Sequence, residues 1–91
     1  MLYHRSRDVT WELADDRAVI LDAGGSTLTT LNPVGTLIWR YLDEPRRPAD
    51  VAELLAGDFP AVDRDDLVDD ATAFLRRLAD EGLVVAADAR G

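Results

Sequence analysis

The apolar residues change their period at Asn32-Pro33, and this change constrains the fold more than any other feature. Before this point they occur in short alternating or continuous runs, which are typical of strands. After it they recur on one face of a helix, as Val34, Leu37, Ile38, Tyr41 and Leu42. Asn can cap the free amides of a helix, and Pro fits its first turn. A helix is therefore expected to begin at Pro33.

Three strands are predicted ahead of this helix. Residues 9–13 alternate apolar and polar side chains, and residues 18–21 form a short apolar run. Residues 26–31 are β-branched and polar at alternate positions, and a glycine turn at 24–25 precedes them. If the strands form a simple antiparallel meander, the third one lies at an edge with its outer backbone groups unpaired.

Two more helices are predicted after the first. Pro48 opens the second, which ends at Gly57, and Asp63 caps the third. Gly82 suits a left-handed stop, after which residues 83–85 form either a final strand or a packing tail. The third helix carries two apolar rows, one of Leu67, Ala71, Phe74 and Leu78, and one of Val68, Leu75 and Ala79.

This order of elements is typical of an α+β protein. We predict a single domain over residues 1–91 with its core at about 9–85. In it, a three-stranded antiparallel sheet packs on a three-helix bundle, in an arrangement like that of a winged helix-turn-helix.

Composition excludes several classes of function. A formal net charge of -8 disfavours contact with phosphate backbones and anionic membranes, so neither nucleic acid nor membrane is an expected partner. The absence of cysteine excludes a disulfide framework, a thiolate metal site and a cysteine nucleophile, and it fits a reducing compartment. No apolar run approaches the roughly 18 residues of a spanning helix. We expect a soluble, cytoplasmic protein.

The sequence contains no recognisable catalytic or metal-binding constellation. His4 is the only histidine, and no nucleophile or second ligand lies near it in the sequence. Trp11 and Trp39 occupy periodic positions that favour packing over ligand stacking. The acidic pairs lack the spacing of a calcium loop and suit turns and caps better; they are Asp15-Asp16, Asp65-Asp66 and Asp69-Asp70. We therefore expect no enzymatic activity, no cofactor and no metal.

The main rival interpretation is a winged-helix DNA-binding regulator, because three helices and a wing can place a recognition helix in a major groove. The charge of the third helix argues against it. Arg76 and Arg77 are outnumbered there by acids, which are Asp66, Asp69, Asp70, Asp80 and Glu81. A shared fold does not imply a shared function.

Several stretches together carry a family resemblance: Ile20-Leu21-Asp22, the hairpin glycines, Leu31-Asn32-Pro33-Val34-Gly35 with Ile38-Trp39, and Phe74-Leu75 through Glu81-Gly82-Leu83. They resemble the PqqD-like family of precursor-peptide recognition elements over roughly Val9 to Val85. The Leu-Asn-Pro-x-Gly stretch followed by Ile-Trp is the most specific part. Among these proteins, the chain looks most similar to free-standing leader-binding proteins of lasso-peptide pathways.

The resemblance implies that the third strand pairs with the leader of a ribosomally made precursor peptide, whose side chains enter a groove against the third helix. Strand residues expected to bind are Thr27, Leu28, Thr29, Thr30 and Leu31. The expected helix residues are Val68, Asp69, Thr72, Leu75, Arg76 and Ala79, with Asp69 attracting a basic leader residue. The neighbouring row of the helix remains the alternative, and a proline at Thr29 is expected to disturb leader pairing if that amide faces the leader.

The resemblance also implies partners. A non-catalytic, free-standing module would present the leader to a separate processing enzyme, here expected to be the cysteine leader peptidase of a lasso-peptide pathway. A radical S-adenosylmethionine enzyme that modifies peptides is the alternative partner. A further alternative is that the chain itself is a purely structural adaptor between two enzymes. We expect a monomer or a weak homodimer.

Overall fold

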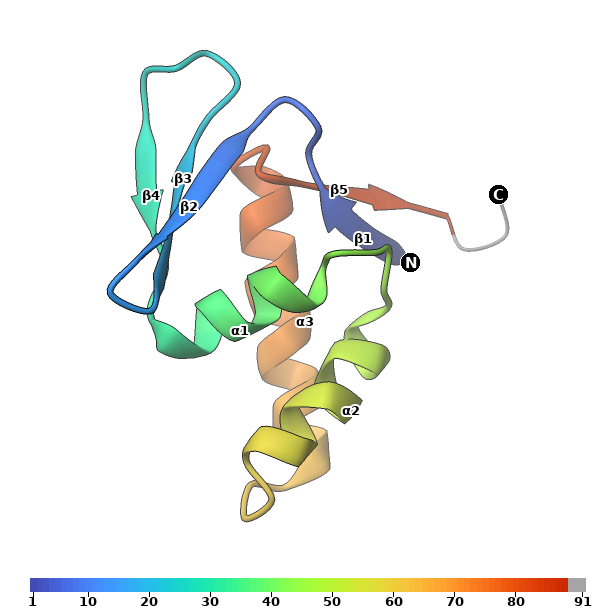
Figure 1. Cartoon of the computed structure of the whole chain (residues 1–91). Helices are drawn as coiled ribbons and strands as arrows, with labels where there is room; N and C mark the ends of the chain where they lie inside the picture. Colours follow the sequence, from blue (N-terminus) through green and yellow to red (C-terminus); the bar gives the residue numbers. More distant parts are fainter. Residues whose placement is uncertain (89–91) are drawn as a thin grey trace.

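The computed structural model describes residues 1–88, and Figure 1 shows two small sheets around three helices. In chain order the elements are β1 (Leu2–Arg5), β2 (Thr10–Ala14), β3 (Arg17–Leu21), β4 (Leu28–Thr30), α1 (Pro33–Tyr41), α2 (Pro48–Asp58), α3 (Arg64–Asp80) and β5 (Val84–Ala87). The antiparallel sheet has the order β2-β3-β4, and β1 pairs with β5 in the second sheet. The predicted α+β class is confirmed.

A two-residue turn joins β2 to β3. Asp15 and Asp16 have φ values of 52° and 68°, which is the left-handed backbone that a type I′ hairpin turn requires. Asp tolerates this conformation better than most residues. The resulting register directs Ala18 and Ile20 of β3 into the core, where both are fully buried.

The start of α1 fixes this helix against both the sheet and α3. Asn32 Oδ1 accepts a hydrogen bond from the amide of Gly35 at 2.7 Å, which is the predicted cap. Thr36 Oγ1 accepts one from the amide of Ala18 in β3 at 2.9 Å. On the other side, a Cβ added to Gly35 would lie 2.8 Å from Cζ of Phe74 in α3. Only glycine allows so close an approach.

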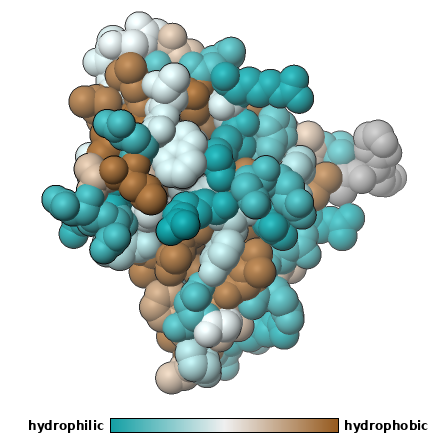
Figure 2. Space-filling model, viewed as in Figure 1, coloured by the Kyte–Doolittle hydropathy of each residue, from teal (hydrophilic) through white to brown (hydrophobic). Residues whose placement is uncertain are grey.

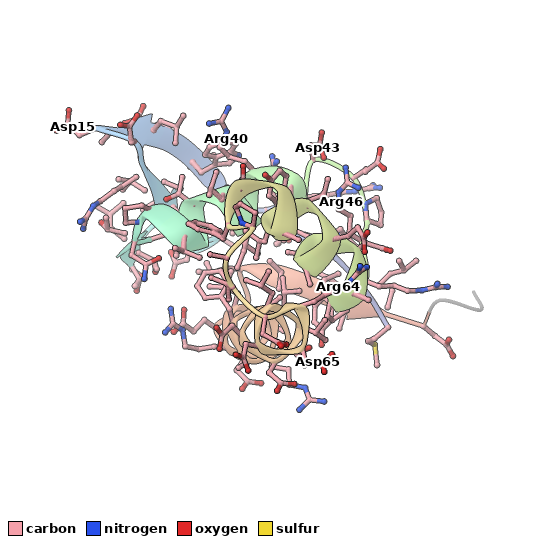
Figure 3. The ribbon with its side chains drawn as sticks, turned by 90° about the horizontal axis from the view of Figure 1, so that it is seen from below. Asp15, Arg40, Asp43, Arg46, Arg64 and Asp65 are labelled. Carbon is pink, nitrogen blue, oxygen red and sulfur yellow. The ribbon has the colours of Figure 1, made fainter. Side chains whose placement is uncertain are left out.

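The core lies where α1, α2 and α3 meet the inner face of the sheet. Figure 3 looks up from below, with α2 beside α3 and with Arg64 at the beginning of α3. Arg64 forms an ion pair with Glu53 of α2, and both side chains are exposed, so the pair adds little stability. The largest fully buried side chains are Trp39, Ile20, Leu31, Leu55, Leu75, Leu78 and Val51.

The first strand, β1, differs from the prediction. The sequence interpretation left residues 1–8 outside the core, whereas the structure pairs Leu2 with Ala87 and buries Tyr3. Tyr3 and Arg46 exchange two backbone hydrogen bonds, of 2.8 and 3.0 Å. A four-residue strand with one buried side chain has almost no periodic signal, and its partner lies at the other end of the sequence. The same pairing shows that the chain forms a strand at Val84–Ala87, which decides between the final strand and the packing tail expected at residues 83–85.

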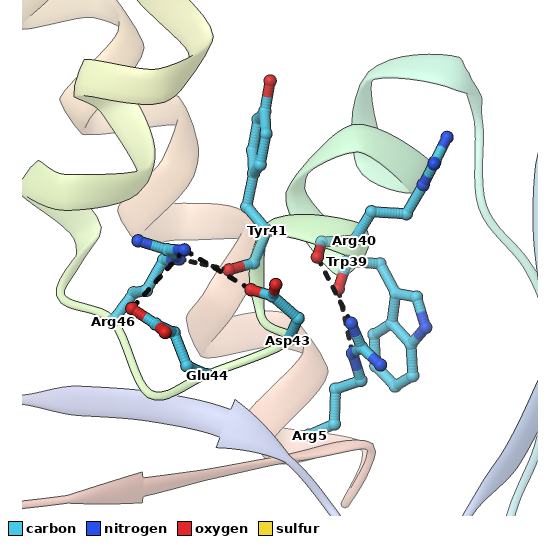
Figure 4. Close-up of polar contacts among 7 residues, drawn as sticks. All are labelled: Arg5, Trp39, Arg40, Tyr41, Asp43, Glu44 and Arg46. Atoms are coloured by element: carbon cyan, nitrogen blue, oxygen red, sulfur yellow. Dashed lines mark hydrogen bonds and ion pairs between the residues drawn. The ribbon is translucent and has the colours of Figure 1, made fainter.

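Arg5 holds β1 against the end of α1. Its Nε donates to the carbonyl of Trp39 at 3.0 Å and its Nη2 to that of Arg40 at 3.2 Å (Figure 4). The guanidinium also lies 4.9 Å from the ring of Trp11 and 5.6 Å from that of Trp39. Partial burial lowers the pKa of Arg5, and Asp43 opposes that shift. A cation here also complements the negative end of the helix dipole.

Asp22 organises the loop between β3 and β4. Its Oδ1 accepts hydrogen bonds from the amides of Ser26 at 3.0 Å and Thr27 at 3.3 Å. Gly25 has a φ of 71° and donates to the carbonyl of Asp22. These bonds, led by the one from Ser26, hold the pKa of Asp22 below its ordinary value of 3.8. The loop thereby sets the position at which β4 begins.

Gly35→Ala should destabilise the fold, because the new methyl group would force Phe74 or α1 to move. We expect a loss of about 1–3 kcal/mol in the free energy of unfolding, measured by urea denaturation. Gly57→Ala is the matched control, since nothing lies within 4 Å of a Cβ at Gly57. It should unfold at the wild-type urea concentration or higher. Equal midpoints for the two variants would contradict the proposed contact.

Asp22→Ala should destabilise the protein at neutral pH, and the difference from wild type should shrink in acid. The folded pKa of Asp22 lies below its unfolded value, so its contribution is complete above the ordinary value of 3.8 and is lost as pH falls through the folded value. Urea unfolding at several pH values measures this difference. Ser26→Ala keeps the backbone donor and should match wild type throughout; a pH-independent loss in Asp22→Ala would refute the charge argument.

Candidate functional site

The strand β4 is the last in its sheet, and no described strand pairs with its far side. Two bonds fix which of its residues face β3: the Leu31 amide donates to the Ala18 carbonyl at 2.9 Å, and the Asp22 amide to the Thr27 carbonyl at 3.1 Å. Because facing alternates along an antiparallel strand, the Thr29 backbone also points to β3. The backbone groups of Leu28 and Thr30 therefore point to the open side.

This alternation decides a condition that the sequence left open, namely whether the Thr29 amide faces the open edge. The Thr29 amide serves the β3 pairing, which the cross-strand partner Ile20 confirms. A proline at Thr29 would therefore damage the sheet itself before it affected anything bound at the edge. Leu28 and Thr30 carry the accessible amides. Identifying them requires the register between β3 and β4, which the periodicity of the sequence does not give.

The open edge at β4 lacks the features that usually protect an edge strand. From Ser26 to Leu31 the chain contains no charged residue, no proline and no glycine. The opposite edge strand, β2, carries Glu12 and leads into the acidic turn at Asp15-Asp16. The sheet thus has a charged edge at β2, which disfavours pairing, and an uncharged edge at β4, which can pair with another strand.

A groove of about 560 Å³ runs between this edge and the end of α3. We call it the β4 groove; its lining residues are Asp22, Thr27, Leu28, Thr29, Thr30, Glu81 and Leu83. Figure 1 shows β4 to one side of α3, with β1 and β5 on the other. The groove therefore places side-chain contacts directly beside the unpaired backbone of β4.

The flank of α3 beside the β4 groove is the one that carries Phe74 and Glu81. Phe74 approaches Gly35, where the chain leaves β4 for α1, and Glu81 lines the groove itself. At 3.6 residues per turn these two positions differ by only about 20° around the helix. Arg77 stands over the Phe74 ring at 5.2 Å and belongs to the same flank. We call this the Phe74–Glu81 flank.

The row of α3 expected from the sequence does not meet the β4 groove. Val68, Thr72 and Ala79 lie about 120–160° around the helix from Phe74, on the opposite flank, and all three are half-buried. The Thr72 hydroxyl donates to the Val68 carbonyl at 2.7 Å. Leu75 is fully buried in the core, and Asp69 and Arg76 are exposed away from it. The neighbouring row, kept as the alternative, contains Phe74.

The strand half of the expected site is brought together in the groove. Thr27, Leu28, Thr29 and Thr30 all line it, although β4 itself spans only Leu28–Thr30, so the strand predicted at residues 26–31 was too long at both ends. The side chain of Leu31 is buried in the core. Roles in binding for these residues remain predictions.

The sequence interpretation missed two carboxylates of the groove, Asp22 and Glu81. Glu81 caps the C-terminal end of α3, where the helix dipole disfavours a negative charge. An acid at the C-terminal end of a helix costs stability. Such an unfavourable placement of Glu81 was the sequence signal that could have pointed to a functional role. Asp69, the acid expected from the sequence to attract a basic leader residue, does not line this groove, and its role in binding stays a prediction.

Other polar groups lie outside this groove. Tyr41 donates from its hydroxyl to Asp58, and this bond raises the pKa of Tyr41. Arg46 pairs with Asp43 and Glu44 and bonds the Tyr41 carbonyl (Figure 4). Among residues 1–88, no group of three or more His, Asp or Glu side chains is arranged to hold a metal ion. No helix in the same residues is both long and apolar enough to cross a membrane.

Two solved structures resemble this chain over most of its length. TbiB1 in complex with the TbiA(beta) leader peptide is 32% identical, with a TM-score of 0.83, and the match covers 93% of this chain and 99% of that one. Lasso peptide synthetase B1 complexed with the leader peptide is 28% identical, with a TM-score of 0.78 and coverage of 92% and 98%. A comparison with curated proteins gives no match.

A third structure is the PqqD truncation of Methylobacterium extorquens PqqCD, described as a stand-alone RiPP recognition element. It is 16% identical, with a TM-score of 0.76 and coverage of 93% and 89%, so it supports the fold alone. The family model of coenzyme PQQ synthesis protein D (PqqD) matches residues 17–84, from β3 to the first residue of β5. This match spans well over half of the sequence, and the chain therefore belongs to the PqqD family.

Proposed function

We propose that this protein binds the leader of a ribosomally made precursor peptide by adding it as a fourth strand beside β4. The observation that carries the proposal is the uncharged, unpaired edge of β4 next to a groove. Binding by strand addition takes affinity from backbone hydrogen bonds and selectivity from pockets beneath alternate side chains. The two relatives whose titles record bound leader peptides, at 32% and 28% identity, support this function.

The backbone part of the interaction is small and well defined. Leu28 and Thr30 each offer one amide and one carbonyl, which makes four groups for the leader. Each bond contributes roughly 0.5–1.5 kcal/mol after its exchange with water, so side-chain burial in the groove must supply the rest. The Phe74–Glu81 flank would meet side chains of the leader that point inward.

Charge favours a leader with basic residues. The chain has a net charge of -8, and two carboxylates, Asp22 and Glu81, line the groove. Complementary charge would speed the encounter and exclude acidic competitors more than it would raise affinity. The ion pairs formed within residues 1–88 do not include Glu81, so within that part of the chain its carboxylate is available to a cation.

The bound leader would then be delivered to a separate enzyme. Holding the precursor beside that enzyme raises its local concentration, so processing accelerates without any chemistry in this chain. We propose the leader peptidase of lasso-peptide biosynthesis as the enzyme, because the two similar leader complexes include a lasso peptide synthetase component. A radical S-adenosylmethionine enzyme is the alternative, and genes that neighbour this one distinguish the two.

The direct test is a fluorescence-polarisation titration of the protein against a labelled synthetic leader from the precursor encoded beside its gene. Saturable binding to that leader, with none to a scrambled leader or to duplex DNA, is the expected result. Binding to DNA alone would support the winged-helix regulator instead. Failure to bind the leader at protein concentrations in the millimolar range would refute the proposal.

Thr30→Pro should weaken leader binding while leaving the fold intact. Proline removes the outward amide of Thr30, and an edge strand tolerates this on its open side. One lost hydrogen bond predicts a rise in Kd of roughly two- to tenfold, measured by the same titration. Thr30→Ala keeps the amide and is the control.

Thr29→Pro provides the contrasting case. Its amide faces β3, so this variant should lose stability in urea denaturation, as Thr30→Pro should not. A folded Thr30→Pro protein with wild-type leader affinity would exclude pairing at the open edge of β4.

A further inference from the structure

The outer face of the β2-β3-β4 sheet, which points away from the helices, carries a connected apolar surface. Val19 and Leu21 of β3 are half-buried there, and Leu28 of β4 is 67% exposed. A shallow groove of about 290 Å³ crosses this face and is lined by Thr10, Trp11, Glu12, Val19, Leu21 and Leu28. Figure 2 shows apolar side chains gathered over the part of the molecule where these strands lie.

The strand register arranges this face into two cross-strand rows. Leu21 stands opposite Thr10 on β2 and opposite Leu28 on β4. Val19 stands opposite Glu12 and Thr30 in the same way. Each row ends at the open edge, one with Leu28 and one with Thr30. An added strand would therefore extend both rows by one residue.

The geometry of antiparallel pairing fixes which residue of an added strand meets Leu28. The backbone groups of Leu28 face outward, so Leu28 and the residue opposite it would exchange two hydrogen bonds. Directly opposite residues have their side chains on the same face, with Cβ atoms about 4.5–5.5 Å apart. The residue that pairs with Leu28 through its backbone thus also contacts the Leu28 side chain on the outer face.

We propose that Leu28 is a specificity-determining residue, which contacts an apolar side chain of the bound peptide strand on the outer face of the sheet. This inference rests on the proposed function and adds a second contact surface to the inward-facing β4 groove. An apolar, β-branched or aromatic residue at this position would continue the row of Leu21 and Leu28. Two residues along the peptide, the position opposite Thr30 accepts a polar or β-branched residue.

The apolar outer face of the sheet continues to the open edge of β4, and this continuity indicates which partner covers Leu28. Leu28 is not a lone exposed leucine, because Leu21 beside it in the row and Val19 on the same face are also apolar. The next position in that row belongs to whatever strand pairs with β4. No described element of the chain covers it, so the leader strand that pairs there is also the partner that buries Leu28.

The test uses the labelled synthetic leader from the precursor encoded beside the gene, with two single-residue scans of that peptide. Backbone N-methylation should weaken binding at alternate residues, and these are the residues whose amides face β4. Alanine replacement then identifies the residue coupled to Leu28, by a double-mutant cycle with Leu28→Ala. The coupled residue should be apolar and should be one of those sensitive to N-methylation.

Leu28→Ala should raise the Kd for the wild-type leader by roughly three- to fivefold, as expected for one cross-strand apolar pair. Leu13→Ala is the matched control, because Leu13 is an exposed leucine, at 46%, on the other edge strand. It should bind as wild type does. Leu28→Thr, which introduces a β-branched residue of high strand propensity, should weaken binding in the same way if Leu28→Ala unfolds.

A charge exchange tests the contact independently of fold stability. Leu28→Lys should weaken binding of the wild-type leader, and a leader with Glu at the coupled position should recover part of the loss. Equal affinities for Leu28→Ala and Leu13→Ala, in a protein that binds its leader saturably, would overturn this inference and leave strand addition standing. A wild-type protein that does not bind the leader would overturn both.

Discussion

The stacking of Arg5 on two tryptophans joins three parts of the chain, and the arrangement of the fold depends on it. Trp39 is fully buried and meets Trp11 edge to face, with ring centroids 6.0 Å apart and planes at 83°. The Arg5 guanidinium contacts both rings and bonds the last carbonyls of α1. One cluster thereby fixes β1, β2 and the end of α1 relative to one another. Because α1 follows directly from β4, the same cluster also helps to orient the open edge.

Local signals account for the elements that sequence analysis located correctly. The Asn32 cap and the period of 3.6 residues after Pro33 specify α1 without reference to other parts of the chain. The acidic turn at Asp15-Asp16 likewise specifies the first hairpin. β1 was missed because its burial comes from pairing with β5 across the length of the chain. Tyr3 is the only buried residue of β1, so this strand shows no alternation of apolar and polar residues in the sequence.

Some features of the candidate site could likewise be predicted from the sequence, and others depend on tertiary structure. An edge strand follows from strand order alone, and Thr27 to Thr30 of the expected binding strand line the groove, while their role in binding stays a prediction. Which amides of β4 are accessible depends on register, and which flank of α3 faces β4 depends on the packing of Phe74 against Gly35. A helix with a broad apolar stripe presents two flanks of similar character, and periodicity alone does not distinguish them. Leu75 was therefore assigned to the groove although it belongs to the core.

The shortness of β4 has a kinetic consequence. If a peptide pairs with β4 as proposed, a strand of three residues would hold it through few backbone groups, and it would dissociate faster than from a longer edge with the same side-chain contacts. For a module that serves an enzyme, a brief residence time is useful, because a spent peptide must leave before the next can enter. A longer β4 would bind more tightly and turn over more slowly. With the proposed function, the length of this strand would thus set a balance between capture and release.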